Sequence, residues 1–429
     1  MMAALGGVTP RRSARSAALR NFAWLMTDKA MALVFGLVVF GLIARHFGPE
    51  GSGHFAYALA LLQTALGLSL VCSAVPLLPR LCRLRSGVAG VVANVFVVRM
   101  AGSIAAAGGV ALYALATIDS PKRLAIALIV LASVPLIEPF YTAVAYWQSR
   151  NDNRPPTITR GVGLLTRATL VLIAVSLHAP LWIVALAWLM EAAVSATLQV
   201  RTVSHLGTLR EMAQRVTRRR SAALFRFGVR FLAGLALAAV FLRLDRIFLA
   251  ERLPVHEFGL YAAAMQLVDV WLQIAYLIGF ATGPAFLYAS VAAGKPAWTH
   301  WRAAAVLAGT GITGLLAVLA FGDVALRVVF GRAFDGSYPY LVAGVAFGVL
   351  LFIDQLVQIT IAATNRPLAL VVKWGAASAA ALAAMWLLYP TLAAFAGPTG
   401  LAIGIVAGWV GAGITLRFTR IDNAAGARA

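Results

Sequence analysis

The chain alternates long apolar runs with short polar segments. About 20 apolar residues are enough for a helix to cross the hydrocarbon core of a bilayer, so each long run predicts a membrane-spanning helix. The runs number twelve, six on each side of a polar segment: 22–46, 53–78, 87–117, 123–147, 157–178, 180–203, 224–250, 256–290, 301–322, 338–364, 366–388 and 397–418. The pattern therefore predicts an all-α, polytopic membrane protein with about twelve transmembrane helices in two pseudo-symmetric six-helix bundles.

Composition agrees with this class. Hydrophobic residues make up 61% of the 429 residues and charged residues 12%, whereas a soluble domain carries about 25% charged residues. No phosphate-binding loop and no HExxH motif occurs, and the two cysteines and six histidines show no metal-ligand spacing. We therefore expect no catalytic group, no metal and no cofactor, and we predict that the protein is not an enzyme.

A formal net charge of +21 would indicate a nucleic-acid partner in a soluble protein. In a membrane protein, Lys and Arg instead concentrate in the cytoplasmic segments. With the N-terminus inside, 24 of them, Arg160 and Lys373 included, fall in inner segments and 6 in outer segments. This asymmetry predicts a multi-pass protein of the cytoplasmic (inner) membrane with both termini in the cytoplasm and no nucleic-acid partner.

The same pattern divides the chain into five segments. They are a basic cytoplasmic N-terminus at 1–21, an N-terminal six-helix bundle at 22–203, a basic cytoplasmic linker at 204–223, a C-terminal six-helix bundle at 224–418 and a cytoplasmic tail at 419–429. The basic linker is interpreted as a topological anchor, and the alternative is a contact for anionic lipid headgroups or a partner.

A stretch of the first half recurs in the second half at a fixed offset of 206 positions. The matching pairs include Ala44 with Ala250, Gly53 with Gly259, Phe55 with Tyr261 and Ala58 with Ala264. An offset near half the chain length suggests two structurally related halves around a central site. Because most of the identities are Gly or Ala, biased composition remains the alternative explanation.

Several ionisable residues lie inside the predicted helices, where a charge is costly and usually faces the protein interior or a watery cavity. They are Asp28, Lys29, Arg99, Glu138, Arg167, Glu191, Arg230, Arg243, Asp245, Arg246, Asp269 and Asp354. Glu138 lies between Pro135 and Pro139, where a bend in the helix is expected. Each of these charges is a candidate for function.

Arg243 and Arg246 are three residues apart and share a helix face, whereas Asp245 points about 100 to 200 degrees away from them. Two guanidiniums on one face suit bidentate contacts with phosphate or carboxylate oxygens. Two alternatives remain. Asp245 pairs with an arginine of another helix to fix packing, or these side chains lie at the outer interface and reach toward water.

Four acidic residues are candidates for ion coupling or ion pairing: Asp28, Asp245, Asp269 and Asp354. Asp28 lies about two turns into the first predicted helix and is expected to face a cavity or a partner cation. Asp269 and Asp354 are lone carboxylates on their helices. Each either binds a coupling proton or cation or neutralises an arginine.

Four stretches carry a resemblance to a known family: IARHFGPEGSGHFAY at 43–57, YWQSRNDNRPPTITR at 146–160, LDRIFLAERLPVHEFGLYAAA at 244–264 and AATNRP at 362–367. Through their order and their agreement with twelve helices, the chain resembles the Wzx-type polysaccharide flippases. These oligosaccharide repeat-unit translocases belong to the multidrug/oligosaccharidyl-lipid/polysaccharide (MOP) exporter superfamily. The resemblance covers essentially the whole chain.

The resemblance implies two six-helix bundles around a central cavity. It also implies alternating-access transport of an undecaprenyl-diphosphate-linked oligosaccharide from the inner to the outer leaflet of the bacterial cytoplasmic membrane, for polysaccharide biosynthesis. A diphosphate-sugar headgroup is anionic and very polar, so it needs a hydrated, cationic cavity. Asp245 would hold an arginine in place, and the cations of that cavity would be Lys29, Arg99, Arg230, Arg243 and Arg246.

The expected partners are the lipid-linked oligosaccharide and membrane lipids, and the candidate protein partners are the polysaccharide polymerase and glycosyltransferases of the same pathway. A cation-coupled multidrug antiporter of the same superfamily is the main alternative, although the excess of intramembrane arginines counts against it. The lipid II flippase resembles a fourteen-helix design. A membrane polymerase or ligase would need a large external loop, and a non-transporting scaffold does not explain the intramembrane charges.

Overall fold

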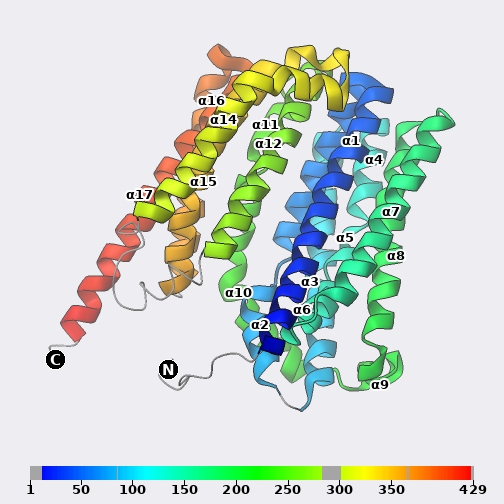
Figure 1. Ribbon diagram of the computed structural model, residues 1–429, viewed down its shortest axis with the longest axis vertical. Coiled ribbons are helices and arrows are strands. Elements are labelled where there is room, and N and C mark those ends of the chain that lie inside the picture. Colours follow the sequence, from blue (N-terminus) through cyan, green and yellow to red (C-terminus); the bar gives the residue numbers. More distant parts are fainter. Residues whose placement is uncertain (1–11, 85, 283–300, 365–366, 427–429) are drawn as a thin grey trace.

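The computed structural model describes residues 12–84, 86–282, 301–364 and 367–426, which form helices and no β-strand (Figure 1). The helices of the first half are α1 (Arg12–Leu68), α2 (Ala74–Arg83), α3 (Val88–Thr117), α4 (Pro121–Leu131), α5 (Val134–Ile137), α6 (Tyr141–Ser149), α7 (Arg154–Ser176) and α8 (Leu181–Thr202). Those that follow are α9 (Leu209–Gln214), α10 (Arg218–Phe241), α11 (Leu244–Ala250), α12 (Val255–Thr282), α14 (Trp301–Phe330), α15 (Tyr338–Thr364), α16 (Pro367–Leu392) and α17 (Ala396–Gly426). Short 3₁₀ helices cover Ser204–Leu206, Arg332–Ser337 and Ala393–Phe395.

Nine helical stretches of the described residues are long and apolar enough to cross a membrane, and the bent helix α10 is a further candidate. Two of the nine, Leu19–Leu68 and Pro367–Leu416, contain 50 residues each, which is enough for two spans. The first is interrupted at Gly48, and the second at the 3₁₀ turn Ala393–Phe395. The chain is therefore a multi-pass, all-α membrane protein with about twelve transmembrane helices, as the apolar runs predict.

Gly48 separates the first two spans because its backbone, at φ 66° and ψ −169°, is in a conformation that favours glycine. Pro49 follows, and its fixed φ suits the first turn of the next helix. The prediction that the second helix extends to residue 78 is wrong, since α1 ends at Leu68. The apolar run continues into α2, which is a separate helix with buried Leu77 and Leu81 and exposed Arg80. Hydropathy alone does not distinguish such an amphipathic helix from the end of a span.

Two further expected spans are interrupted. The run 123–147 is divided into α4, α5 and α6, and the bend expected beside Glu138 is confirmed. The run 224–250 is divided into α10 and α11 at Leu242 and Arg243. Neither residue is a proline or a glycine, so the sequence gives no signal for this break. The run 256–290 corresponds to α12 as far as Thr282, and its remainder lies outside the described residues.

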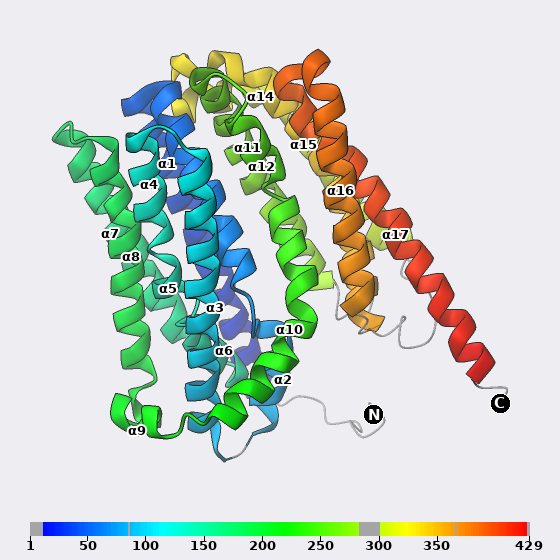
Figure 2. The same ribbon diagram turned by 180° about the vertical axis from the view of Figure 1, so that it is seen from behind.

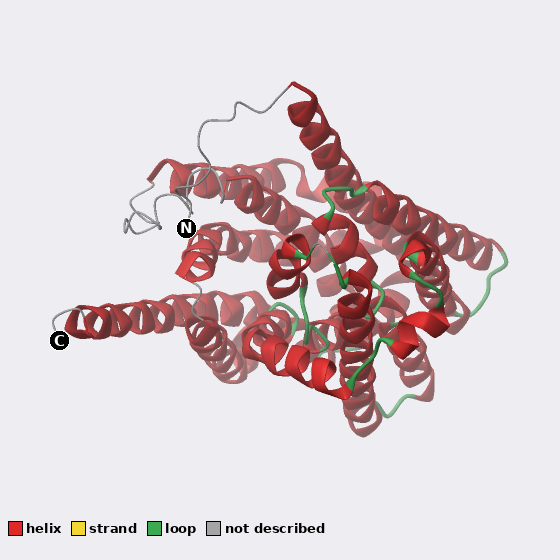
Figure 3. Cartoon of the chain, turned by 90° about the horizontal axis from the view of Figure 1, so that it is seen from below, coloured by secondary structure: helices red, strands yellow, loops and turns green. Residues whose placement is uncertain are grey.

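The two halves lie side by side, and α1 begins at the same end of the molecule at which α17 ends (Figures 1 and 2). At the opposite, upper end the halves are joined by hydrogen bonds. Arg45 Nε donates to the carbonyl of Val329 at 3.1 Å, and Arg123 Nη2 donates to the carbonyl of Ala250 at 3.1 Å. At the lower end the C-terminal end of α17 extends away from the other helices (Figure 3). The halves are thus joined by these bonds at the upper end and by a contact of α10 with the first half, where Cys72 Sγ donates to the carbonyl of Leu224, whereas α17 diverges at the lower end.

The repeated segments pack directly against each other. A Cβ on Gly53 would lie 2.7 Å from the carbonyl oxygen of Val255, and a Cβ on Gly259 would lie 1.8 Å from that of Pro49. Pro49 and Val255 are themselves 206 positions apart, so the two contacts are equivalent under the repeat. This reciprocal crossing of α1 and α12 supports two structurally related halves rather than a coincidence of composition.

Candidate functional site

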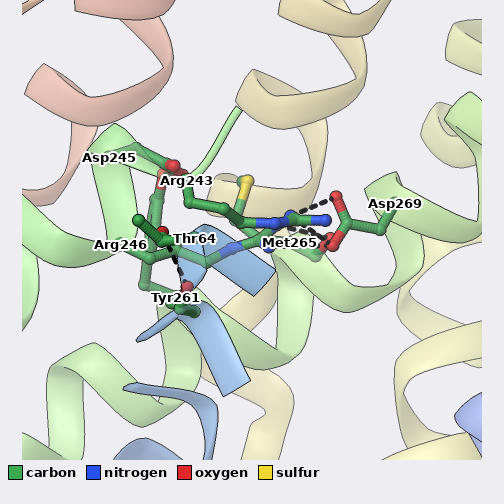
Figure 4. A network of polar contacts seen from close by, with 8 residues as sticks. Thr64, Arg243, Asp245, Arg246, Tyr261, Met265 and Asp269 are labelled. Atoms are coloured by element: carbon green, nitrogen blue, oxygen red, sulfur yellow. Dashed lines mark hydrogen bonds and ion pairs between the residues drawn. The ribbon is translucent and has the colours of Figure 1, made fainter. Parts of the chain in front are cut away.

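The arginines of the seventh predicted span lie at the break in that span. α10 ends at Phe241, and Arg243, with φ −125° and ψ 0°, directly precedes α11. The break leaves Arg243 outside both helices, and its side chain points to α12, as does that of Arg246 (Figure 4). The two guanidiniums therefore meet on one side, as their spacing predicts, although the helix is interrupted.

Arg243 and Arg246 both bind Asp269 of α12, and we call these three residues the arginine cluster. Arg243 Nη1 lies 3.0 and 2.7 Å from the two carboxylate oxygens of Asp269, and Arg246 Nη1 lies 2.8 Å from Oδ2. Arg246 Nη2 also donates to the carbonyl of Met265 at 3.2 Å. Asp269 lies about 21 Å along α12 from Val255, at a rise of about 1.5 Å per residue. The cluster therefore lies deep within the helices.

Two guanidiniums share one carboxylate in the arginine cluster, so each has donors to spare. The side chains of Arg243 and Asp269 are 16% and 19% exposed, so the cluster is not completely enclosed. A carboxylate and a phosphate present similar oxygen pairs to a guanidinium. The arrangement is therefore suited to binding an anionic group in place of, or beside, Asp269.

Asp245 is directed away from the arginine cluster. Its Oδ2 accepts a hydrogen bond from the hydroxyl of Tyr261 at 2.5 Å, and its Oδ1 has no hydrogen-bond partner among the described residues. Asp269, rather than Asp245, is the carboxylate that contacts the two arginines. Asp245 and Arg246 are 1% and 7% exposed, which excludes the alternative that they reach out to the surface.

A second polar region lies inside the N-terminal half, in a cavity of about 490 Å³ that we call the N-terminal cavity. Its walls come from α1, α3, α5, α6, α7 and α8, and Gln266 of α12 closes one side. The ionisable residues of its lining are Asp28, Lys29, Arg99, Arg160, Arg167 and Glu191. The expectation that Asp28 faces a cavity or a partner cation is met in both respects, since Asp28 is also 3.1 Å from Arg160.

The arginines of the N-terminal cavity each have a carboxylate partner. Besides the Asp28 pair, Arg167 Nη1 lies 2.7 Å from Glu191. Arg99 Nη2 lies 2.9 Å from Glu138, and both side chains are almost fully buried. Lys29 also lies 3.9 Å from Asp28, so the four cations of the cavity have three carboxylate partners.

The two regions adjoin along α12. Gln266, in the wall of the N-terminal cavity, and Asp269, in the arginine cluster, are three residues apart. On a helix this spacing makes neighbours on one face, about 5–6 Å apart. The structure thus brings Lys29 and Arg99 together in one region and Arg243 and Arg246 in another, with α12 between them.

Asp354 lies in a third, closed cluster. Its Oδ2 is 2.7 Å from Lys373 Nζ, and Trp409 Nε1 donates to its Oδ1 at 2.7 Å. The side chains of Lys373 and Asp354 are 0% and 1% exposed, so this pair ties α15, α16 and α17 together without contact to the N-terminal cavity. A coupling role for Asp354 stays a prediction.

Sequence reasoning missed two cations of these regions. Arg160 and Lys373 lie inside the expected runs 157–178 and 366–388 and within α7 and α16, but the charge count assigns them to inner segments instead of to the candidate charges. Arg230 lies in α10, but its side chain is outside the described part of the chain. Among the described residues, no three His, Cys, Asp or Glu side chains are grouped to hold a metal ion.

The helices and their buried polar regions define a multi-pass membrane protein built of two related halves. In sequence, residues 18–288, more than half of the chain, match the family described as polysaccharide biosynthesis protein. The chain belongs to this family. No curated protein matches it.

Solved structures show the same fold. The chain is similar to an inward-facing multidrug resistance MATE family transporter of the MOP superfamily, with a TM-score of 0.67 and 15% identity over 95% of this chain and 99% of that one. It is also similar to the lipid II flippase MurJ in an inward closed conformation, with a TM-score of 0.63 and 12% identity over 94% and 87%. It is similar as well to the Vibrio cholerae MATE transporter VcmN in its bent form, with a TM-score of 0.57 and 15% identity over 96% of this chain and 99% of that one. The fold that the family resemblance implies is confirmed.

Proposed function

We propose that this protein is a flippase that moves an undecaprenyl-diphosphate-linked oligosaccharide from the inner to the outer leaflet of the bacterial cytoplasmic membrane by alternating access. The observation that carries the proposal is the arginine cluster, in which two guanidiniums share one carboxylate deep inside a chain of the polysaccharide biosynthesis family. Guanidiniums replace water around phosphate oxygens with charge-assisted hydrogen bonds. A diphosphate can then cross the membrane while its lipid tail stays in the bilayer.

Lys29 and Arg99 of the N-terminal cavity, together with Arg230, complete the proposed set of cations that contact the substrate. The acidic residues Asp28, Asp245, Asp269 and Asp354 are the proposed ion-pair and coupling groups. Asp269 has a distinct part in this scheme, because it holds both arginines in position and competes with the phosphates for them. Such competition allows the substrate to be released as well as bound.

The proposed topology has both termini, the linker 204–223 and the tail 419–429 in the cytoplasm, with bundles at 22–203 and 224–418. Two features support it. Lys and Arg are concentrated in the segments that this topology places inside. In addition, the described chain begins and ends at the lower end of the molecule, the end at which α9 also lies (Figure 1). The polymerase and glycosyltransferases of the pathway remain proposed protein partners, and we propose no enzymatic activity.

The alternative function is a cation-coupled multidrug antiporter, which the similarity of fold to MATE transporters and the carboxylates of the N-terminal cavity favour. The excess of arginine over carboxylate at the arginine cluster disfavours it, because a cationic drug needs an anionic site. The likeness of fold to MurJ makes lipid II a third candidate substrate.

The test is translocation in proteoliposomes, with a fluorescent undecaprenyl-diphosphate oligosaccharide, lipid II and a cationic dye as parallel substrates. The native chain is compared with Arg243→Ala plus Arg246→Ala, and with a control of equal charge change at two exposed residues, Arg210→Ala plus Arg219→Ala. We expect the native and control chains to move the oligosaccharide lipid, and the cluster variant to lose this activity while it remains folded. A native chain that exchanges the dye for protons and moves no lipid-linked sugar would establish the antiporter instead.

A further inference from the structure

The first half contains a second pocket, which we call the lateral pocket. Its volume is about 580 Å³, within the range of small-molecule sites, about 300–1,000 Å³. Its walls come from α3, from the junction of α5 and α6, from the C-terminal end of α8 and from α9. Most of the lining is apolar, Phe96, Phe140 and Met212 included, and none of the described lining residues carries a charge. The lateral pocket therefore suits an apolar group.

The lateral pocket faces away from the N-terminal cavity. Tyr141 and Gln148 of α6 line the cavity, whereas Ala143 of the same helix lines the lateral pocket. At 3.6 residues per turn, Ala143 lies about 140–160° around the helix from both. Val97 and Leu209, which also line the lateral pocket, are 41% and 74% exposed. The pocket is therefore on the outer side of these helices, where a membrane-spanning bundle meets lipid.

α9 and the residues that follow it form an amphipathic wall of the pocket. Leu209, Met212, Ala213 and Val216 line the lateral pocket, and their spacing of three, four and seven residues is that of one side of a helix. The residues between them are polar or charged. α9 lies at the lower ends of α3 and α8 (Figure 2). An amphipathic segment at the end of membrane-spanning helices lies where hydrocarbon meets lipid headgroups.

Two exposed arginines of the linker lie close to the lateral pocket. Arg215 Nη1 donates to the carbonyl of Leu206 at 3.5 Å, at the turn between α8 and α9. A Cβ on Gly90 of α3, three residues before Ala93 of the lining, would lie 3.4 Å from Arg220 Nη1. Neither arginine forms an ion pair within the part of the chain that the structure describes. A topological anchor accounts for these charges, but not for the apolar pocket beside them.

Asn94 of α3 fixes these arginines relative to the pocket. Asn94 is fully buried. Its Nδ2 donates to the carbonyl of Arg215 at 3.0 Å, and its Oδ1 accepts from the backbone N–H of Thr217 and from the hydroxyl of Ser221, each at 3.0 Å. The linker is thus attached to α3 on both sides of the turn into α10, so Arg215 and Arg220 are held at the pocket rather than on a free loop.

We propose that the lateral pocket binds an anionic phospholipid, with an acyl chain in the pocket and the phosphate held by Arg215 and Arg220. Guanidiniums form charge-assisted hydrogen bonds with phosphate oxygens. Because these two have no acidic partner among the described residues, they favour a headgroup of net negative charge over a zwitterionic one. The site lies outside the N-terminal cavity and the arginine cluster, so the bound lipid is distinct from the transported substrate. The inference therefore does not depend on the proposed function.

The experiment compares two lipids with identical acyl chains, phosphatidylglycerol and phosphatidylcholine. Their binding to the purified full chain in detergent is titrated by native mass spectrometry. We expect the native chain to prefer phosphatidylglycerol, and Arg215→Gln plus Arg220→Gln to weaken binding of this lipid about tenfold. The control of equal charge change is Arg80→Gln plus Arg83→Gln, at two exposed residues of α2, and it should bind as the native chain does.

A further pair of variants tests the pocket itself. Ala213→Trp fills space in the pocket and should weaken binding of both lipids, whereas Gln214→Trp, at the next exposed residue, should change neither affinity. All four variants alter exposed side chains, so their melting midpoints should equal that of the native chain.

Two results on phospholipids overturn the proposal: equal affinity of the native chain for both lipids, or an equal loss of binding in the α2 control. A third concerns undecaprenyl phosphate, titrated in the same way. If Ala213→Trp abolishes its binding while binding of phosphatidylglycerol persists, a polyprenyl chain occupies the pocket and the phospholipid site is refuted.

Discussion

The crossing of α1 and α12 allows a direct test of how the two halves are held together. The perturbation is Gly259→Ala, which adds one methyl group at the contact with Pro49. The new Cβ would lie 1.8 Å from the carbonyl oxygen of Pro49, whereas ordinary van der Waals contact begins at 3.4 Å. The helices must therefore separate locally by about 1.6 Å, the difference of these two distances, because the nearest atoms are the O, C and Cα of Pro49, which are backbone atoms that cannot rotate away.

Two opposing terms set the magnitude. Overpacking of this kind costs about 1–3 kcal/mol, and replacement of a helical glycine by alanine gains about 1 kcal/mol in helix propensity. Gly108 of α3 provides the control, because a Cβ there meets nothing within 4 Å and only the propensity gain remains. The difference in stability between Gly259→Ala and Gly108→Ala thus isolates the packing cost, about 1–3 kcal/mol.

The assay is thermal melting of the purified full chain in detergent, with the native chain and both variants measured in parallel. We expect the midpoint to fall for Gly259→Ala and to rise for Gly108→Ala. Gly53→Ala should lie between them, because its Cβ would be 2.7 Å from the carbonyl oxygen of Val255. If Gly259→Ala melts as high as Gly108→Ala, the close crossing does not exist in the protein and the reasoning fails.

Three further predictions concern buried polar contacts, and denaturant titration of the full chain measures each. Lys373→Met leaves Asp354 buried without its partner and should cost about 3–5 kcal/mol, most of which the added change Asp354→Leu should restore; absence of that recovery would contradict the pairing. Asp269→Asn should destabilise the chain, because two adjacent guanidiniums lose their shared carboxylate, and an unchanged midpoint would argue against the cluster. Asn94→Ala should cost about 1–3 kcal/mol, because Asn94 Oδ1 accepts from the backbone N–H of Thr217 at 3.0 Å and nothing in alanine replaces it; a neutral result would refute that contact.

The span pattern was readable from the sequence because each span must satisfy its own backbone and present apolar side chains to lipid. These are local requirements, so the runs at 87–117 and 157–178 correspond closely to α3 and α7. Local signals also located the bend beside Glu138 and the break between the runs 22–46 and 53–78, in which Gly48 lies. The break at Leu242 and Arg243 could not be predicted from the sequence, since neither residue has a conformational preference that interrupts a helix. At this break Arg243 contacts Asp269 of α12.

The candidate site was readable only as a set of costly charges. Hydropathy places Asp28, Arg99, Arg243 and Asp269 within long apolar runs, where a charge is costly and is expected to be buried. The pairing of these charges follows from the tertiary structure. It joined Arg243 to Asp269 rather than to Asp245, and it set Gln266 beside the cluster. Pairing depends on the rotation and crossing of helices far apart in the chain, and these are decided by the packing of the whole molecule, which no local pattern of residues contains.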